Sequence, residues 1–163
     1  MADVNIKING KDYQVPEGIT VLEAARMANI HIPTLCFLKE INEIGACRMC
    51  VVEVKGAKGL VTSCVYPVAE GMEIFTQTKR VIESRVKNLQ LLLSNHNREC
   101  LSCVRSGNCE LQALCRLYDI REDSIYDGEK PKYALDGSAV HLVRDNNKCI
   151  LCSLCVAVCE KNQ

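Results

Sequence analysis

The sequence has no tryptophan, only two phenylalanines and no excess of charge, since its 20 basic and 20 acidic residues cancel. A nucleic-acid-binding protein usually carries a basic surface and aromatic side chains on which bases stack. Both features are scarce in this chain. The composition therefore argues against nucleic acid as a partner and predicts protein partners.

Long apolar runs are also missing. A membrane-spanning helix needs about 20 consecutive apolar residues, whereas the longest leucine-rich patch, residues 89–93, is interrupted by Gln90. The first residues, Met1 to Asn5, show no basic stretch followed by an apolar run, so we expect no secretory signal. The sequence therefore predicts a cytoplasmic protein with no membrane span.

Cysteine, in contrast, is abundant, with 12 among 163 residues. In a secreted protein these thiols could pair as disulfides, but in a reducing compartment they more often bind metals. They fall into three groups along the chain, and one group includes a histidine. Because small cysteine-rich modules can be stabilised by metals rather than by a large core, the sequence predicts a row of metal centres.

The N-terminal part has the pattern of a small mixed sheet with one helix. Apolar and polar residues alternate over residues 4–15, and Asn9-Gly10 in the middle favours a two-residue hairpin turn. Thr20 and Glu23 form a capping-box pattern, which predicts a helix that is stopped at residues 31–33. Alternation predicts further strands over residues 49–54, 59–63 and 72–76.

The period then changes to 3.6 residues. Residues 79–95 carry apolar side chains at helical spacing, and a second short helix is expected over residues 109–117. The acidic stretch 119–137, which contains Gly and Pro, is expected to be a surface connection, followed by a strand over residues 139–143. We expect three modules, covering residues 1–78, 79–118 and 119–163.

The first cysteine group is suited to a two-iron cluster. It consists of Cys36, Cys47, Cys50 and Cys64, with a loop over residues 41–46 that is long enough to wrap a cluster. A 2Fe-2S cluster needs four thiolates, two on each iron. A zinc site is the alternative, but four-cysteine zinc sites usually pair two Cys-x2-Cys knuckles, and this group has one. The spacing favours 2Fe-2S, although it departs from the plant-type Cys-x4-Cys-x2-Cys pattern.

The second group combines one imidazole with three thiols. His96, Cys100, Cys103 and Cys109 fit either a zinc site or a 4Fe-4S cluster with one histidine ligand. By itself the motif favours zinc, and a histidine that follows a helix is often a C-terminal cap. Because the motif lies between two other cysteine groups, however, we interpret it as a 4Fe-4S site.

The third group matches the bacterial ferredoxin run, with Glu160 in place of the usual proline. In that run Cys149, Cys152 and Cys155 would fill three corners of a 4Fe-4S cube, and Cys159 would bind a different cluster. The sequence ends shortly after Cys159, so we expect a truncated two-cluster domain. Cys115 could supply a remote fourth thiolate, but the sequence favours a buried helix residue with no ligand role.

Three segments carry a resemblance to a known family: INEIGACRMCVVEV (residues 41–54), NHNREC (95–100) and SGNCELQ (106–112). Together with the order of the three cysteine groups, they resemble the N-terminal iron-sulfur region of di-iron (iron-only) hydrogenases. The large iron-sulfur subunit of complex I and the diaphorase iron-sulfur subunits of NAD-reducing hydrogenases are similar. The resemblance covers essentially the whole chain. It implies an α+β protein in which a β-grasp, ferredoxin-like 2Fe-2S domain is followed by small helical 4Fe-4S modules.

The resemblance also implies the ligand sets. Cys36, Cys47, Cys50 and Cys64 would hold the 2Fe-2S cluster, and His96, Cys100, Cys103 and Cys109 a 4Fe-4S cluster. Cys149, Cys152 and Cys155 would be an incomplete 4Fe-4S set, and Cys159 would belong to a second ferredoxin cluster whose other ligands are absent.

The function that the resemblance implies is an electron relay. Electrons would pass between a flavin or NAD(P)H-binding partner, or ferredoxin, and a hydrogen-activating domain outside this sequence, with small iron-sulfur subunits as further partners. The alternatives are an iron-sulfur subunit of a formate dehydrogenase or of a complex I type NADH dehydrogenase, and, in a different class, a zinc-binding structural module. No nucleophile and base pattern supports hydrolysis, and His31 and His141 stand alone. We therefore expect part of an oxidoreductase with no catalytic residues of its own.

Overall fold

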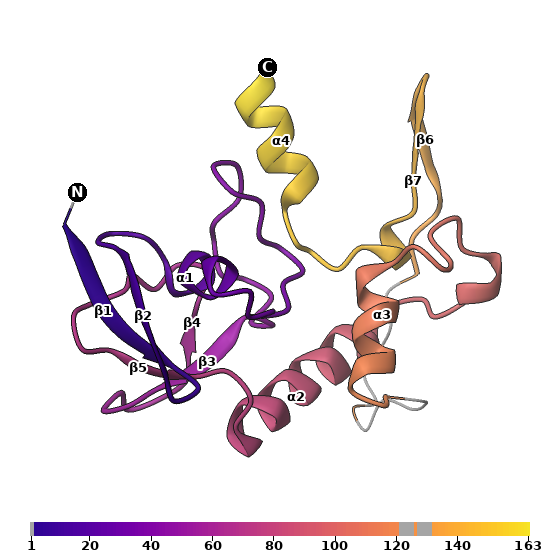
Figure 1. Ribbon diagram of the computed structural model, residues 1–163. Helices are drawn as coiled ribbons and strands as arrows, with labels where there is room; N and C mark the ends of the chain where they lie inside the picture. The colour runs from indigo at the N-terminus through magenta and orange to yellow at the C-terminus, as the bar shows by residue number, and fades with distance from the viewer. Residues whose placement is uncertain (1, 121–125, 127–131) are drawn as a thin grey trace. The chain divides into compact units, whose positions relative to one another are not determined.

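The computed structural model describes residues 2–120, 126 and 132–163 (Figure 1). The chain divides into two compact units, Met1–Arg85 with Ser153–Gln163, and Val86–Cys152. Of the connection expected over residues 119–137, residues 121–125 and 127–131 lie outside the described part. None of the described helices is both long enough and apolar enough to cross a membrane.

The first unit is built on a five-stranded sheet with the order β2-β1-β5-β3-β4 (Figure 1). Its strands are β1 (Asp3–Ile8), β2 (Lys11–Pro16), β3 (Val51–Val54), β4 (Val61–Thr62) and β5 (Glu73–Phe75). β1 and β5 run parallel, and the other neighbouring pairs are antiparallel. This mixed sheet, accompanied by few helices, confirms the expected α+β class.

The β1–β2 hairpin has the expected two-residue turn. Asn9 and Gly10 both adopt positive φ angles, 50° and 83°, which a turn of the I′ type requires and which these two residues tolerate best. The turn fixes the register, so that Val4 pairs with Val15. Because side chains alternate along a strand, the apolar side chains of β1 then all face the core.

Helix α1 (Val21–Met27) begins with the expected capping box. Thr20 Oγ1 accepts a hydrogen bond from the Glu23 backbone N–H at 3.3 Å, and Glu23 Oε2 accepts one from the Thr20 N–H at 3.1 Å. The helix ends before residues 31–33, where the sequence pattern placed its end. Asn29 adopts a left-handed conformation with φ of 55°, which breaks the helix one turn early.

One hydrophobic core joins α1 to the sheet. Its buried apolar side chains come from β1, α1, β3 and β5, and include Ile8, Val21, Leu22, Val52 and Ile74. Each such side chain contributes about 1.5–3 kcal/mol when it is fully buried. Cys50 and Cys64 belong to the same core cluster. The core therefore fixes the positions of two of the predicted ligands.

Helix α2 (Lys79–Asn95) has the bounds that the sequence periodicity predicts. Its start is capped by Thr78, whose Oγ1 accepts from the Val81 N–H at 3.3 Å. Val81 and Leu89 are fully buried. The helix runs from the first unit into the second and ends immediately before His96.

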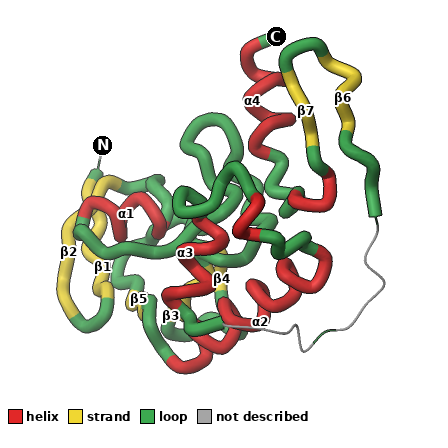
Figure 2. Tube along the Cα trace, turned by 90° about the vertical axis from the view of Figure 1, so that its right-hand side faces the viewer, coloured by secondary structure: helices red, strands yellow, loops and turns green. Residues whose placement is uncertain are grey.

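The second unit contains α3 (Glu110–Leu117) and the two-stranded hairpin of β6 (Asp136–Ala139) and β7 (Leu142–Arg144), whose strands are yellow in Figure 2. The expectation of a single strand over residues 139–143 is wrong. The chain reverses at Val140-His141. Across the hairpin Arg144 forms an ion pair with Asp136, with 3.6 Å between Arg144 Nη2 and Asp136 Oδ2. Asp136 and Gly137 are poor strand formers, so β6 left no clear alternation in the sequence.

Candidate metal centres

The four cysteines of the first group lie in loops at the edges of the core. Cys36, Cys50 and Cys64 are each 1% exposed, and Cys47 is half-buried. The Cys50 and Cys64 sulfurs are 3.3 Å apart, while the Cys47 backbone N–H donates to the Cys36 sulfur at 3.5 Å. The structure thus brings the predicted ligands together as two contacting pairs of cysteines.

The loop around Cys47 owes its shape to two residues with positive φ, one on each side of Cys47. Gly45 has φ of 62°, and a Cβ atom there would lie 3.4 Å from Thr62 Oγ1 and 3.5 Å from Val65 Cγ2. Arg48, between Cys47 and Cys50, is also left-handed, with φ of 56°. L-residues other than glycine are strained in that conformation. The loop therefore curls tightly beside the thiols.

The buried thiols influence one another's ionisation. The Cys50 and Cys64 side chains share a hydrogen bond, with their sulfurs 3.3 Å apart, and this contact lowers the pKa of Cys50 to about 6. The pKa of Cys64 is raised, because its contact with Cys50 and its burial beside the other cysteines both disfavour its charged form. Burial also raises the pKa of Cys36. One thiolate is therefore available at neutral pH, and the other protons must leave when a cationic centre binds.

Two polar side chains hold this region by hydrogen bonds to backbone carbonyl groups: Asn42, in the loop that the sequence predicted, and Arg85, which the sequence did not assign to the site. Asn42, which is 3% exposed, donates from Nδ2 to the Cys36 carbonyl oxygen at 2.7 Å. The Arg85 side chain is fully buried, and its Nη2 donates to the Val51 carbonyl oxygen, next to Cys50, at 2.7 Å. Arg85 lies midway between the buried Val81 and Leu89 on one helical face, a spacing from which its burial was predictable.

The second group surrounds a cavity of about 850 Å³ in the second unit. Of the predicted ligands, His96, Cys100 and Cys109 line it, and Cys115 lines it as well. The remaining predicted ligand, Cys103, is linked to Cys100 by a backbone N–H···O bond of 3.3 Å. The cavity thus gathers one imidazole and several thiols.

The imidazole of His96 has the properties of a neutral ligand. Burial lowers its pKa, the positive charge of Lys148 adds to this effect, and Asp145 opposes it. Its Nδ1 atom is buried and has no hydrogen-bond partner among the described residues. Buried polar atoms are almost always hydrogen-bonded, so the unpartnered nitrogen fits a side chain whose partner is a bound metal centre.

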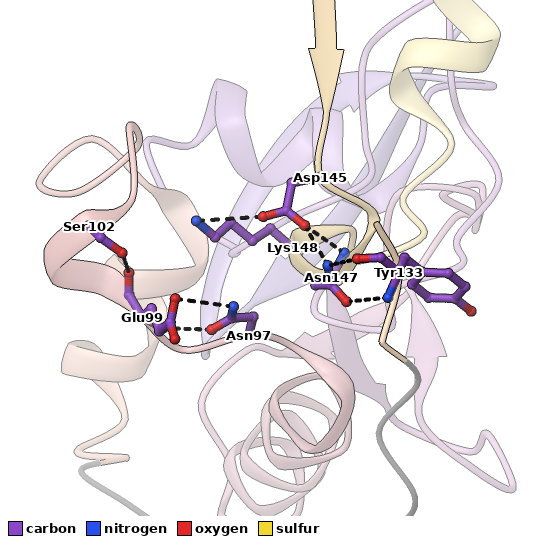
Figure 3. A network of polar contacts seen from close by, with 7 residues as sticks. All are labelled: Asn97, Glu99, Ser102, Tyr133, Asp145, Asn147 and Lys148. Carbon is purple, nitrogen blue, oxygen red and sulfur yellow. Dashed lines mark hydrogen bonds and ion pairs between the residues drawn. The ribbon is translucent and has the colours of Figure 1, made fainter. Parts of the chain in front are cut away.

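A polar network in the second unit joins the residue after His96 to the residues before Cys149 (Figure 3). The Asn97 backbone N–H donates to the Asn147 carbonyl oxygen at 2.8 Å. The Asn147 side chain accepts from the Tyr133 N–H and donates to the Tyr133 carbonyl oxygen, both at 2.9 Å. It also donates to Asp145 at 2.8 Å. Asn147 therefore links three segments that are distant in the sequence.

Replacing Asn147 by alanine is expected to loosen this part of the second unit. The substitution removes the acceptor of the Tyr133 amide, and a lost hydrogen bond of this kind costs about 1 kcal/mol. We therefore expect about fivefold faster hydrogen exchange at the Tyr133 amide, measured by mass spectrometry. The control is Asn146→Ala, the neighbouring asparagine. Equal exchange rates in the two variants would show that the network does not hold Tyr133.

The third cysteine run falls in both units. Cys149 and Cys152 belong to the second unit, where the Leu151 N–H donates to the Cys149 sulfur at 3.4 Å. Cys155 and Cys159 lie one turn apart on α4 (Leu154–Asn162), in the first unit. Cys152 is half-buried and the other three are exposed. In the described part of the chain, no three His, Cys, Asp or Glu side chains are arranged to hold a single metal ion.

Two family profiles match the chain. The family described as "2Fe-2S iron-sulfur cluster binding domain" matches residues 1–79. The family described as "NADH-ubiquinone oxidoreductase-G iron-sulfur binding region" matches residues 85–124. The expected 2Fe-2S and 4Fe-4S cofactors are confirmed by these matches.

Curated proteins also resemble the chain over its full length. It is 44% identical to the NADP-reducing hydrogenase subunit HndD of Solidesulfovibrio fructosivorans, with 100% of this chain and 28% of that protein covered. It is 37% identical to iron hydrogenase 1 of Clostridium pasteurianum, with 96% of this chain and 27% of that protein covered. The chain therefore spans less than a third of the length of either relative.

A solved structure has the same fold. The crystal structure of an NAD+-reducing [NiFe]-hydrogenase in the H2-reduced state superimposes with a TM-score of 0.90 at 34% sequence identity. The match covers 98% of this chain and 67% of that chain. The arrangement of a mixed sheet followed by small helical modules is thus shared with a protein of known structure.

Proposed function

Because the chain belongs to the iron-sulfur family shared by hydrogenase and NADH dehydrogenase subunits, we propose that it relays electrons within a hydrogenase. Electrons would pass between a flavin or NAD(P)H-binding partner, or ferredoxin, and a hydrogen-activating domain outside this sequence. The observation that carries the proposal is that three groups of candidate ligands follow one another along the chain. In the first group three of the four cysteines are buried, and in the second group three of the four residues line a cavity.

The proposed ligands follow from the donor sets. Cys36, Cys47, Cys50 and Cys64 would hold the 2Fe-2S cluster, and His96, Cys100, Cys103 and Cys109 a 4Fe-4S cluster. Cys149, Cys152 and Cys155 would contribute to a further 4Fe-4S cluster, and Cys159 to another. We further propose that these sites define three modules, over residues 1–78, 79–118 and 119–163.

The clusters, when bound, supply the one-electron chemistry. The chain's own residues set how easily each centre accepts an electron. A neutral imidazole in place of a thiolate makes a centre less negative and favours its reduced form. The N–H of Cys47, which donates to the Cys36 sulfur, acts in the same direction at the first site. His96 therefore distinguishes the middle centre from the centres with only thiolate ligands.

A second candidate is an iron-sulfur subunit of a complex I type NADH dehydrogenase. The match of residues 85–124 to an NADH-ubiquinone oxidoreductase region favours it. The 44% identity to a hydrogenase subunit over the whole chain favours the hydrogenase. Both candidates use the same ligands and differ in the domain to which electrons pass.

The test uses the assembled hydrogenase, in which this chain carries its clusters and is joined to the proposed hydrogen-activating domain. Under hydrogen gas, without NAD(P)H, we expect the visible absorption of the iron-sulfur clusters to bleach and to recover when an electron acceptor is added. Bleaching by NADH but not by hydrogen would identify the NADH dehydrogenase candidate instead. Absence of bleaching by any reductant, dithionite included, would contradict both.

A further inference from the structure

Cys115 lies in the cavity of the middle site although it is outside every predicted ligand set of that site. Helix α3 begins directly after Cys109 and carries Cys115 near its C-terminal end. The backbone N–H of Ile120 donates to the Cys115 carbonyl oxygen at 2.8 Å and closes the helix there. The cavity that Cys115 lines is also lined by His96, Cys100 and Cys109.

The ionisation of Cys115 reflects the same neighbours. Burial raises the pKa of its thiol, and the charges of Cys100 and Cys109 raise it further. Cys115 is therefore close enough to two of the proposed ligand cysteines to be affected by their charge. A cysteine binds iron as the thiolate, so Cys115 would lose its proton on becoming a ligand.

We propose that Cys115 is a replacement ligand, which binds iron in the middle site when His96 does not. The proposal rests on the cluster assignment made above. In the exchange an Fe–N bond to His96 would break and an Fe–S bond to Cys115 would form, the thiol proton would be released to water, the imidazole would leave as the neutral base, and no electron would be transferred. The middle centre would then have two forms, one with a histidine ligand and one with only thiolate ligands.

The two forms differ in how readily they accept an electron. The thiolate adds a negative charge next to the cluster, so the form with Cys115 has the more negative reduction potential. An exchange between His96 and Cys115 would therefore make the middle centre a poorer electron acceptor without loss of its iron.

Three variants of the full chain test the proposal. We expect His96→Ala to keep the iron of the middle cluster, with a changed EPR spectrum and a more negative potential. We expect His96→Ala/Cys115→Ala to lose about four irons per chain, the content of one cubane cluster. The matched control is His96→Ala/Leu117→Ala, which alters the 64% exposed Leu117 on the same helix. It should keep the iron that His96→Ala keeps.

The 2Fe-2S signal of the same samples shows whether the first unit of each variant is folded, and the His96→Ala/Leu117→Ala control shows whether a second substitution on α3 by itself empties the middle site. Loss of about four irons in His96→Ala alone would overturn the proposal, because no replacement would have taken place. Equal iron contents in His96→Ala and His96→Ala/Cys115→Ala would also overturn it. A wild-type protein that binds no iron would instead refute the cluster assignment itself, so the two failures are distinguishable.

Discussion

Replacing Cys50 by alanine is expected to remove the two-iron centre and leave the four-iron centres in place. Cys50 is the thiol whose pKa is lowered to about 6 by its hydrogen bond with Cys64, across which the two sulfurs are 3.3 Å apart. Cys50 is thus the thiol of this pair that loses its proton more readily. A 2Fe-2S cluster requires two thiolates on each iron, so the variant should lose about two irons and the 2Fe-2S EPR signal.

The control for Cys50→Ala is Met49→Leu. Met49 is fully buried beside Cys50, and leucine preserves nearly its volume. It should retain the wild-type iron content, which separates the loss of a ligand from a disturbance of packing. If Cys50→Ala kept the 2Fe-2S signal, the first ligand set would be wrong.

Acidification is expected to abolish the EPR signal of the histidine-ligated centre before the signals of centres with only thiolate ligands. His96 binds iron only as neutral imidazole. Burial lowers its pKa from the ordinary value of about 6.5, so the signal should persist at that pH and be lost at lower pH. The unfolded chain binds more protons on His96 in that range, so the free energy of unfolding also falls as the pH decreases.

Two charge variants test the cause of this pH dependence. The positive charge of Lys148 lowers the pKa of His96, so Lys148→Gln should move the loss of the signal to higher pH. Asp145 raises that pKa, so Asp145→Asn should move the loss to lower pH. Lys87→Gln, at an exposed position on α2, serves as the control. EPR spectra of reduced samples across a pH series give the pH at which each of the three variants loses the signal. If Lys148→Gln and Asp145→Asn moved that pH in the same direction, the assignment of His96 as the titrating ligand would be contradicted.

Local patterns in the sequence predicted much of the fold. The bounds of α2 follow from its apolar period alone, and the capping box and the Asn9-Gly10 turn depend only on residues a few positions apart. The sequence predicted one strand where the structure has the β6–β7 hairpin, because β6 contains Asp136 and Gly137, which rarely occur in strands. Helix α4 was missed, since the spacing of Cys155 and Cys159 was interpreted only as a ligand pattern.

Contacts between distant residues were beyond the reach of the sequence patterns. The spacing of the first group predicts four ligands, but the contact between Cys50 and Cys64 depends on the core that holds both. The bond from Asn97 to Asn147 joins residues on either side of the connection over 119–137. The same limit applies to Cys115: the sequence favoured a buried residue with no ligand role, whereas the structure places it half-buried in the cavity with His96.

The most direct test of the account is to measure iron, acid-labile sulfide and zinc in the purified chain together with its visible spectrum. We predict a brown protein with about six irons if the two complete ligand sets are filled, or about ten if the third run also holds a cluster, and matching sulfide. A colourless protein that contains zinc and no sulfide would contradict the account and support a zinc-binding structural module.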